Sequence, residues 1–260
     1  MRANKTLALL IIVIIISAVA VALSFNAQKK ADAPFTIAIT KQHAKLFENY
    51  KSLSQNLFEE VTIEIYENEA ELMKAVYGGS IDAFSINVFT YLEQYAELPM
   101  GKAIFGLPAD YYLIAKQTGE VERPKIGVFD DTLSFYMLQG IKYTTVAYSD
   151  TSKRLQALND GLIDYAIISS IDYNAENSII FKKMSALGYK EDLFILTRPW
   201  IDLDTDSGLD LINQISKVLP QDIKAPDEVM LMKAMSDLFK DEKIPTRYYY
   251  KDLVYYNQPK

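Results

Sequence analysis

The segments Gly78–Asn87 (GGSIDAFSIN) and Asp160–Ser169 (DGLIDYAIIS) carry one pattern at an offset of 82 residues. Three of their positions are identical: Gly79 with Gly161, Ile81 with Ile163 and Asp82 with Asp164. Such a glycine ends a helix in a left-handed conformation, the isoleucine begins a buried strand, and the aspartate hydrogen-bonds backbone amides of the turn. Two turns can look alike by coincidence. The match continues upstream, however, with Tyr66 on Tyr148 and Ala75 on Ala157, which favours a chain of two equivalent halves.

Strands and helices alternate around both turns. Strand-like runs are found at 35–40, 61–67, 81–86, 102–107 and 110–116, and again at 125–130, 143–150, 162–169 and 193–199. Helical patterns are found at 42–57, 68–77, 88–97, 131–140, 151–161, 175–187, 208–218 and 227–240. Short strands that alternate with helices of this length are typical of βαβ units. We therefore predict an α/β fold of two lobes, each with a mainly parallel sheet flanked by helices.

The composition excludes several classes of function. The net charge is −7 and the longest basic run is Lys29-Lys30, so the chain lacks the basic face that nucleic-acid binding needs. The absence of cysteine excludes disulfides, thiolate metal sites and a cysteine nucleophile. His43 is the only histidine, so a Ser-His-Asp triad would have to use it, and a zinc site would lack its usual ligands. We predict a non-enzymatic protein without cofactor, metal or nucleic-acid partner.

The N-terminus carries a long apolar segment. Thr6–Phe25 has no charged residue and follows Arg2 and Lys5. About 20 residues at a 1.5 Å rise cross the roughly 30 Å hydrocarbon core of a bilayer. An uncleaved membrane anchor, a cleaved signal peptide and a buried core helix are the three interpretations. The first two export the rest of the chain. We assign residues 1–31 to this segment and its polar tether.

Three segments resemble a known family. AVYGGSIDAFSIN (75–87), KIGVFDDTLSFYML (125–138) and ALNDGLIDYAIIS (157–169) are similar to type II periplasmic binding proteins. The nearest group comprises the solute-binding proteins of ABC importers for alkanesulfonates, taurine, nitrate and thiamine precursors. The resemblance implies crossings between lobes near Thr118–Pro124 and Thr197–Trp200. Residues 32–120 and 199–260 would then form lobe 1, and residues 121–198 lobe 2.

The resemblance also implies a function. The protein would be a monomer that captures a small solute outside the cytoplasm and delivers it to the permease of an ABC importer. The family's lipid-anchoring cysteine is missing, and the N-terminal segment would replace it at the membrane. TKQHAKL (40–46) and FDDTLS (129–134) also lack the small residues that let a backbone surround an anion. The alternatives are an enzyme on the same fold, as in the menaquinone pathway, and a ligand-sensing ectodomain.

Candidate ligand-binding residues follow the strands, because open α/β sheets bind ligands at the carboxyl ends of their strands. Thr40, Gln42 and His43 follow the first strand. His43 would face the cleft or would be an exposed residue at a helix start. Asn87 and Ser169 hold equivalent places after the two repeated strands and would contact ligand across the cleft. The alternative role for both is helix capping.

Two further groups of candidates lie in or near the second half. Asp130, Thr132 and Ser134 begin its first helix. They would cap that helix or contact a cationic or hydroxylated ligand, since two aspartates at 130–131 repel an anion. Tyr111 would stack on a planar ligand or pack in the core.

Overall fold

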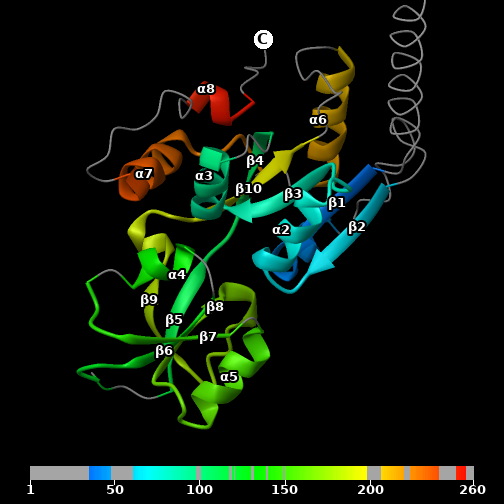
Figure 1. The fold of residues 1–260 in the computed structure, drawn as a ribbon. Coiled ribbons are helices and arrows are strands. Elements are labelled where there is room, and N and C mark those ends of the chain that lie inside the picture. The colour runs from blue at the N-terminus through cyan, green and yellow to red at the C-terminus, as the bar shows by residue number, and fades with distance from the viewer. Residues whose placement is uncertain are drawn as a thin grey trace, which may run out of the picture.

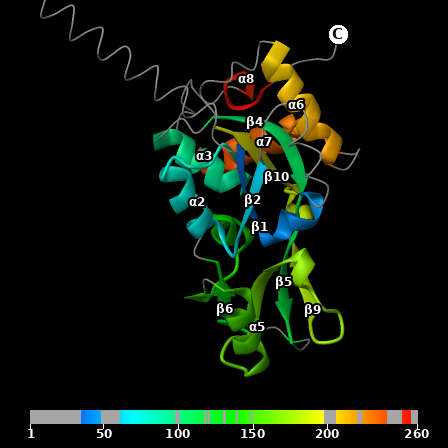
Figure 2. The same cartoon turned by 90° about the vertical axis from the view of Figure 1, so that its right-hand side faces the viewer.

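A computed structural model describes residues 35–47, 61–97, 101–116, 119, 121–129, 132–138, 140–148, 150–197, 206–219, 223–239 and 250–255. The N-terminal segment 1–31 lies outside these residues, so its assignment as anchor or signal stays a prediction. Among the helices in the described ranges, none has both the length and the apolar character needed to cross a membrane. Figures 1 and 2 show two sheets, one above the other, each with its own helices.

The first sheet has the strand order β2-β1-β3-β10-β4. Its strands are β1 (Phe35–Thr40), β2 (Val61–Tyr66), β3 (Ala83–Asn87), β4 (Lys102–Pro108) and β10 (Glu191–Leu196). β1 pairs in parallel with β2 and β3, whereas β10 runs antiparallel to β3 and β4. With this sheet lie the 3-10 helix η1 (Lys41–Phe47) and the helices α2 (Glu69–Tyr77), α3 (Val88–Glu97), α6 (Asp206–Val218), α7 (Glu228–Phe239) and α8 (Tyr250–Leu253). We call this unit lobe 1.

The second sheet has the strand order β7-β6-β8-β5-β9. Its strands are β5 (Tyr111–Ala115), β6 (Lys125–Val128), β7 (Thr144–Ala147), β8 (Tyr165–Ser169) and β9 (Ile179–Lys183). β6 pairs in parallel with β7 and β8, and β5 runs antiparallel to β8 and β9. α4 (Thr132–Met137), α5 (Thr151–Asn159), η3 (Ser170–Asp172) and η4 (Ser185–Leu187) accompany it. We call this unit lobe 2. The two-lobed α/β fold is confirmed, with mixed sheets in place of mainly parallel ones.

The chain crosses between the sheets earlier than expected. β4 ends at Pro108 in the first sheet and β5 begins at Tyr111 in the second, and the return lies between Lys183 and Glu191. The crossings predicted near 118–124 and 197–200 are therefore corrected. The polar run at 118–124 falls between β5 and β6, two strands of the same sheet. Its turn-forming composition indicated an exposed loop, and a change of lobe does not follow from exposure.

One predicted helix is wrong. Residues 175–187 form strand β9 and the short η4. Ile179 and Phe181 of β9 are exposed and Ile180 is half-buried. β9 is paired only through β5 in its sheet. At such an edge the apolar residues need not alternate clearly, so the period of the sequence gave no strand signal there.

The duplicated turn is confirmed in detail. Gly79 and Gly161 have φ values of 76° and 72°. Asp82 accepts a hydrogen bond on Oδ2 from the backbone N–H of Thr36, and Asp164 accepts one from Lys125 N–H, each at 2.8 Å. In both lobes the aspartate therefore connects the turn to the start of the central strand.

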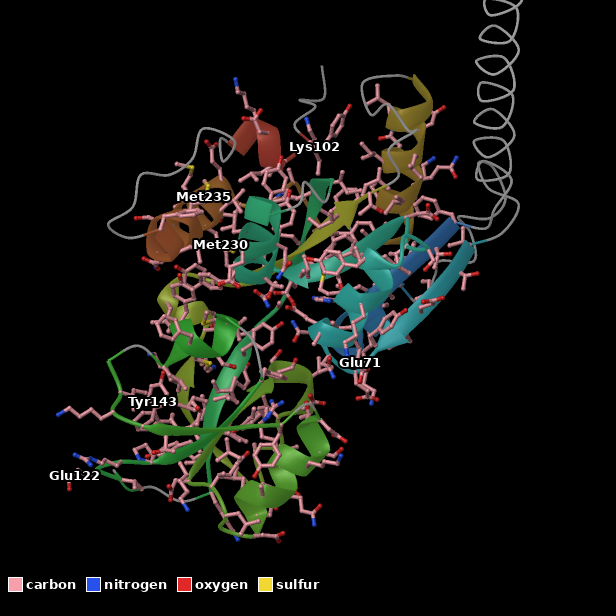
Figure 3. The ribbon with its side chains drawn as sticks, in the orientation of Figure 1. Glu71, Lys102, Glu122, Tyr143, Met230 and Met235 are labelled. Carbon is pink, nitrogen blue, oxygen red and sulfur yellow. The ribbon has the colours of Figure 1, made fainter. Side chains whose placement is uncertain are left out.

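The two faces of the first sheet are covered by different elements. η1 and α6 cover one face through Phe47, Leu211 and Ile215. α2, α3 and α7 cover the other, where Met230 and Met235 of α7 are buried (Figure 3). This second core continues into lobe 2, because Phe89 of α3 stacks on Tyr136 of α4 with 4.0 Å between ring centroids. The lobes are thus in apolar contact beside the crossings.

Candidate functional site

A cavity of about 300 Å³ lies between the two lobes. Its walls are the loops that follow β1 and β2 in lobe 1 and β6, β7 and β8 in lobe 2, together with Tyr111 of β5. These loops are at the carboxyl ends of the strands, the edge at which open α/β sheets bind ligands. The volume is at the lower end of the range for small-molecule sites. The cavity is therefore our candidate ligand site.

The lobe 1 wall is built around the start of α2. Asn68 caps this helix by accepting a hydrogen bond from the backbone N–H of Glu71 at 2.9 Å. The next residue, Glu69, lines the cavity. Its carboxylate accepts hydrogen bonds from the backbone N–H of Asn87 at 2.6 Å and from Oγ1 of Thr90 at 2.9 Å. These contacts fix the Glu69 carboxylate at the edge of the cavity.

The lobe 2 wall has the equivalent helix start. Asp150 caps α5 by accepting a hydrogen bond from the backbone N–H of Ser152 at 2.7 Å. Ser169, at the end of β8, accepts a hydrogen bond from Ile171 N–H at 3.4 Å as the chain enters η3. Phe129 and Tyr148 add aromatic surface. The lining of lobe 2 thus combines a carboxylate, a hydroxyl and an apolar wall.

Arg154 lies directly behind this aromatic wall. It is fully buried on α5, with its guanidinium carbon 3.7 Å from the centroid of the Phe129 ring. Its nitrogens donate hydrogen bonds to the carbonyl oxygen of Tyr148 at 2.9 Å and to that of Ile167. Arg154 is not among the residues that line the cavity. Its charge therefore supports the wall from behind.

Charged groups of the two lobes influence each other across the cavity. Lys41 forms an ion pair with Glu67 at 2.5 Å, and the hydrogen bond to Glu67 raises the pKa of Lys41, with smaller contributions from Asp172 and Asp150 of lobe 2. Hydrogen bonds from Ser152 lower the pKa of Asp150. Burial raises the pKa of Asp172, although Lys41 and Arg154 oppose this shift. The carboxylates of the two lobes therefore share one electrostatic environment.

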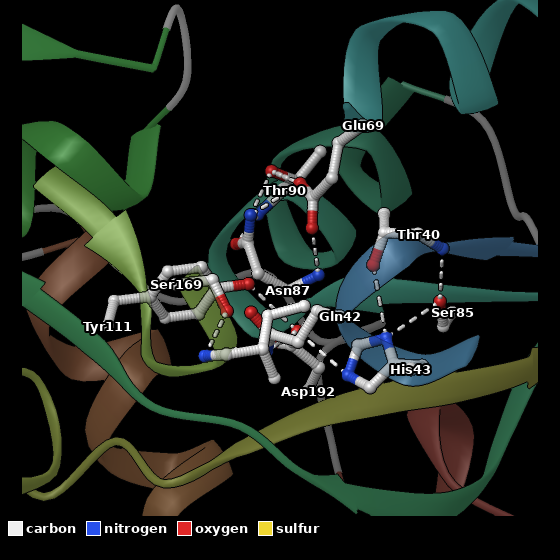
Figure 4. A network of polar contacts seen from close by, with 11 residues as sticks. Thr40, Gln42, His43, Glu69, Ser85, Asn87, Thr90, Tyr111, Ser169 and Asp192 are labelled. Atoms are coloured by element: carbon white, nitrogen blue, oxygen red, sulfur yellow. Dashed lines mark hydrogen bonds and ion pairs between the residues drawn. The ribbon is translucent and has the colours of Figure 1, made fainter. Parts of the chain in front are cut away.

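His43 lies in a network at the base of the lobe 1 wall (Figure 4). Its Nδ1 is 3.0 Å from Oγ of Ser85 and 3.2 Å from Oγ1 of Thr40. Its Nε2 is 3.3 Å from Oδ2 of Asp192 without hydrogen-bond alignment. His43 is fully buried, so it is neither at the cleft surface nor an exposed helix start, which corrects both interpretations.

The order Ser85–His43–Asp192 matches the residue types of a nucleophilic triad, but its environment differs. Ser85 and His43 both have 0% of their surface exposed. The Ser85 hydroxyl also accepts a hydrogen bond from the backbone N–H of Thr40 at 3.3 Å. A nucleophile must reach its substrate. This network therefore orders the end of β1 and does not form an active site.

Asp192 joins this network to the crossing between lobes. Its Oδ2 accepts hydrogen bonds from the Tyr111 hydroxyl at 2.9 Å and from Nε2 of Gln42 at 3.3 Å. Tyr111 begins the first strand of lobe 2, whereas Gln42 and Asp192 belong to lobe 1. The two cavity residues Gln42 and Tyr111 are thus oriented by the same buried carboxylate (Figure 4).

Four of the predicted site residues line the cavity: Thr40, Gln42, Tyr111 and Ser169. Asn87 does not line it. It is buried, its Oδ1 accepts a hydrogen bond from Thr90 N–H at 2.9 Å, and its Nδ2 donates to Glu69. The capping alternative therefore applies to Asn87, and the expected contact with ligand opposite Ser169 is corrected, because α3 begins directly after it.

The turn at the start of α4 contributes less than expected. Ser134 is buried and is not a cavity residue. Thr132 begins α4, but its side chain lies outside the described residues, as does all of Asp130. For these two residues the binding role stays a prediction.

The sequence reasoning missed most of the charged lining, namely Lys41, Glu67, Glu69, Asp150 and Asp172. The repeat itself held the signal for two of these positions. Tyr66 aligns with Tyr148, so the loops that follow them are equivalent, and both lead into helices that face the cavity. In the described part of the chain, no group of three or more histidine or carboxylate side chains is placed to hold a metal ion.

Comparison with known proteins follows this geometry. No protein-family model and no curated sequence matches the chain. Among solved structures, the alkanesulfonate-binding protein of Xanthomonas axonopodis pv. citri bound to MOPS is 16% identical, with a TM-score of 0.61, over 83% of this chain and 95% of that one. The ligand-binding component of an ABC-type import system from Staphylococcus aureus is 14% identical, with a TM-score of 0.61, over 85% and 96%.

A third structure agrees with these two. The periplasmic aliphatic sulphonate binding protein of Escherichia coli is 13% identical, with a TM-score of 0.55, over 80% of this chain and 92% of that one. At these identities the likeness establishes the fold. The chain has the two-lobed fold of type II periplasmic binding proteins. The neighbours named here are substrate-binding proteins, two of them for sulfonates and one from an ABC import system.

Proposed function

We propose that the protein is an extracytoplasmic solute-binding protein that captures a small molecule between its lobes and delivers it to an ABC importer. The observation that carries the proposal is the cavity formed by strand-end loops of both sheets. A ligand in it contacts both lobes at once and thereby favours their closed arrangement. The fold shared with importer components supports this reading.

Segment 6–25 anchors the protein at the outer face of the membrane in this proposal, and the protein works as a monomer. The support is the uncharged length of the segment, which suffices to cross a bilayer. Intact-mass measurement on the membrane fraction tests the anchor. A mass equal to the full chain supports it, whereas a mass lacking the first 20 to 30 residues means a cleaved signal.

Binding is tested by melting the full-length protein in mild detergent with sulfonates, thiamine precursors, amino acids and polyamines. A ligand present at 100 times its dissociation constant adds about 2.7 kcal/mol to the free energy of unfolding. Ala70 lines the cavity and is exposed at the start of α2. Ala70→Trp fills part of the cavity without removing a polar group and should abolish the shift.

Ser80→Trp is the matched control, because Ser80 is exposed on lobe 1 and does not line the cavity. It should leave the ligand-induced shift intact. A ligand that stabilises Ala70→Trp as much as wild type binds elsewhere, and the proposal that this cavity is the site then fails.

A further inference from the structure

The charges around the cavity are unbalanced. Among the described lining residues, the carboxylates of Glu67, Glu69, Asp150 and Asp172 face the single ammonium group of Lys41. Lys41 is already paired with Glu67 at 2.5 Å. Its remaining capacity to attract an anion is therefore small, and an anion in the cavity would meet carboxylates from both lobes.

The other carboxylates are not neutralised by ion pairs within the described residues. Asp150 accepts its hydrogen bonds from the backbone and hydroxyl of Ser152, which are neutral donors. Asp172 accepts no hydrogen bond from any described residue. Both come from lobe 2, opposite the Lys41–Glu67 pair of lobe 1. A ligand between the lobes would therefore meet two carboxylates that are free to receive charged donors.

The second cation near the cavity does not alter this balance at the surface. Arg154 is fully buried behind Phe129, and its guanidinium donates to the carbonyl oxygens of Tyr148 and Ile167. Anion sites in proteins place guanidinium or backbone N–H groups directly against the ligand. Here the guanidinium is separated from the cavity by the aromatic ring.

An independent observation concerns Gln42. Its amide nitrogen donates to Asp192 at 3.3 Å, which fixes the orientation of the amide. The amide oxygen is buried and has no hydrogen-bond partner among the described residues. Gln42 lines the cavity. A buried acceptor without a donor is unfavourable, and a ligand that carries N–H or O–H groups can supply that donor.

The remaining lining is apolar and aromatic. Tyr111, Phe129, Tyr148, Leu155 and Ile171 provide it, and Tyr111 contacts Phe129 edge to face with 6.1 Å between centroids. Aromatic rings attract cations through their negative faces and also pack well against alkyl groups. We propose that the cavity takes a small organic cation, an amine or ammonium compound with an apolar body. This inference rests on the proposed function and names its substrate class.

Charge selectivity can be measured without knowing the natural ligand. Three nitroxide probes share one piperidine body and carry a trimethylammonium, a hydroxyl or a carboxylate group. Each broadens the NMR signals of amides near which it accumulates. We expect the cationic probe to broaden the cavity amides of Ala70, Thr151 and Ile171 several-fold more than the neutral probe, and the anionic probe to broaden them less. Equal broadening by all three probes, or a preference for the carboxylate, overturns the inference.

Two substitutions separate this cavity from the general negative charge of the protein. Asp150→Asn keeps a side chain that caps a helix, and Asp172→Asn keeps the shape of the carboxylate. Together they should reduce the preference for the cationic over the neutral probe to near unity. Glu71→Gln removes a charge from an exposed residue of α2 that does not line the cavity. It should leave the preference intact, and a similar loss in both variants contradicts a local site.

The ligand screen distinguishes failure of this inference from failure of the proposed function. Stabilisation by amines, weakened at least tenfold in affinity by Asp172→Asn, supports both proposals. Stabilisation by a sulfonate that Ala70→Trp abolishes keeps the proposed function and overturns the cationic class. If no solute of any charge stabilises the protein, the proposed function fails and the cationic ligand fails with it, whatever the probes show.

Discussion

The two lobes are built on one backbone plan. In lobe 1, Ile37 and Ala38 of β1 lie opposite Ala83 and Phe84 of β3, and in lobe 2 Ile126 and Gly127 of β6 lie opposite Tyr165 and Ala166 of β8. The offset of 82 residues seen in the sequence thus returns as an equal strand register. It also holds in the outer pairs, because Ile63 and Thr145 lie opposite Ile37 and Ile126. The repeat therefore specifies strand pairing as well as the turn.

The lobes differ in what this plan buries. At the offset of 82, Leu72 of α2 corresponds to Arg154 of α5, and both are fully buried. Leu72 packs in an apolar core that includes Ala38. Arg154 instead crosses the position where Gly127 replaces that alanine and reaches two carbonyl oxygens behind the cavity. Equal backbones can therefore carry an apolar core pair in one lobe and a buried cation beside the candidate site in the other.

Converting the lobe 2 pair into the lobe 1 pair should have the largest effect. Arg154→Leu leaves two buried carbonyls without their donor, so we expect a loss of about 2–4 kcal/mol in the free energy of unfolding. A Cβ on Gly127 would lie 2.8 Å from Cγ of Arg154 and 2.5 Å from Cδ1 of Ile163. Gly127→Ala should therefore cost about 1–3 kcal/mol through overpacking. Urea denaturation measures both.

The double variant is the decisive control. In the Arg154→Leu background one of the two close contacts of Gly127→Ala is gone, and the pair copies Ala38 and Leu72. We expect the second substitution to cost about 1 kcal/mol less there than in wild type, a typical coupling for residues in contact. Strictly additive losses would show that Gly127 is not required by Arg154.

The paired aspartates should give the next effect. Asp82 is 8% exposed, whereas Asp164 is exposed, although each accepts a backbone hydrogen bond at 2.8 Å. Asp82→Ala leaves the Thr36 N–H without its acceptor in a buried place, which should cost about 1.5–3 kcal/mol. After Asp164→Ala water can replace the carboxylate, so the loss should stay below about 1 kcal/mol. Equal losses in chemical denaturation contradict the role of burial.

The repeat explains how much of the fold the sequence could predict. Glycine, isoleucine and aspartate at a helix–strand turn act through local conformation, so both turns, the strands around them and the boundaries of α3 were predictable. The crossings were not, because β5 and β10 are apolar strands whose sheet membership depends on contacts far along the chain. Periodicity carries no information about which of two sheets a strand joins.

The site was predictable only in part for a related reason. Strand ends are visible in a sequence, and they identified Thr40, Gln42 and Ser169. The direction of a side chain at a strand end depends on its neighbours. Asn87 could have faced the cavity, but Glu69, 18 residues earlier, binds both its backbone and its side chain. Such a pairing between residues of different loops has no signature in one sequence.

The two glycines should behave alike, which tests the equivalence of the turns. Both have positive φ, and a Cβ at either position would meet no atom within 4 Å. The cost of Gly79→Ala and Gly161→Ala is therefore conformational strain alone, about 1–2 kcal/mol each. Urea denaturation should give the two losses within about 0.5 kcal/mol of each other. A clear difference would mean that one turn relaxes while the other does not.

The helix caps should show the smallest difference in size but a difference in pH dependence. Asn68→Ala removes a neutral cap from α2 and should cost about 0.5–2 kcal/mol at any pH. The corresponding cap of α5 is Asp150, whose pKa is lowered by hydrogen bonds from Ser152. A carboxyl with a lowered folded-state pKa stabilises the protein above its unfolded value of about 3.9, and this contribution is lost as the pH falls through the folded-state pKa. The destabilisation caused by Asp150→Ala should therefore shrink between pH 5 and pH 3, whereas that of Asn68→Ala should not. Asp150→Asn is the matched control, because asparagine caps without titrating, so its stability relative to Asp150→Ala should be independent of pH. Denaturant unfolding of the three variants across this range decides the question, and parallel curves for the two alanine variants would show that the charge of Asp150 does not contribute to the cap.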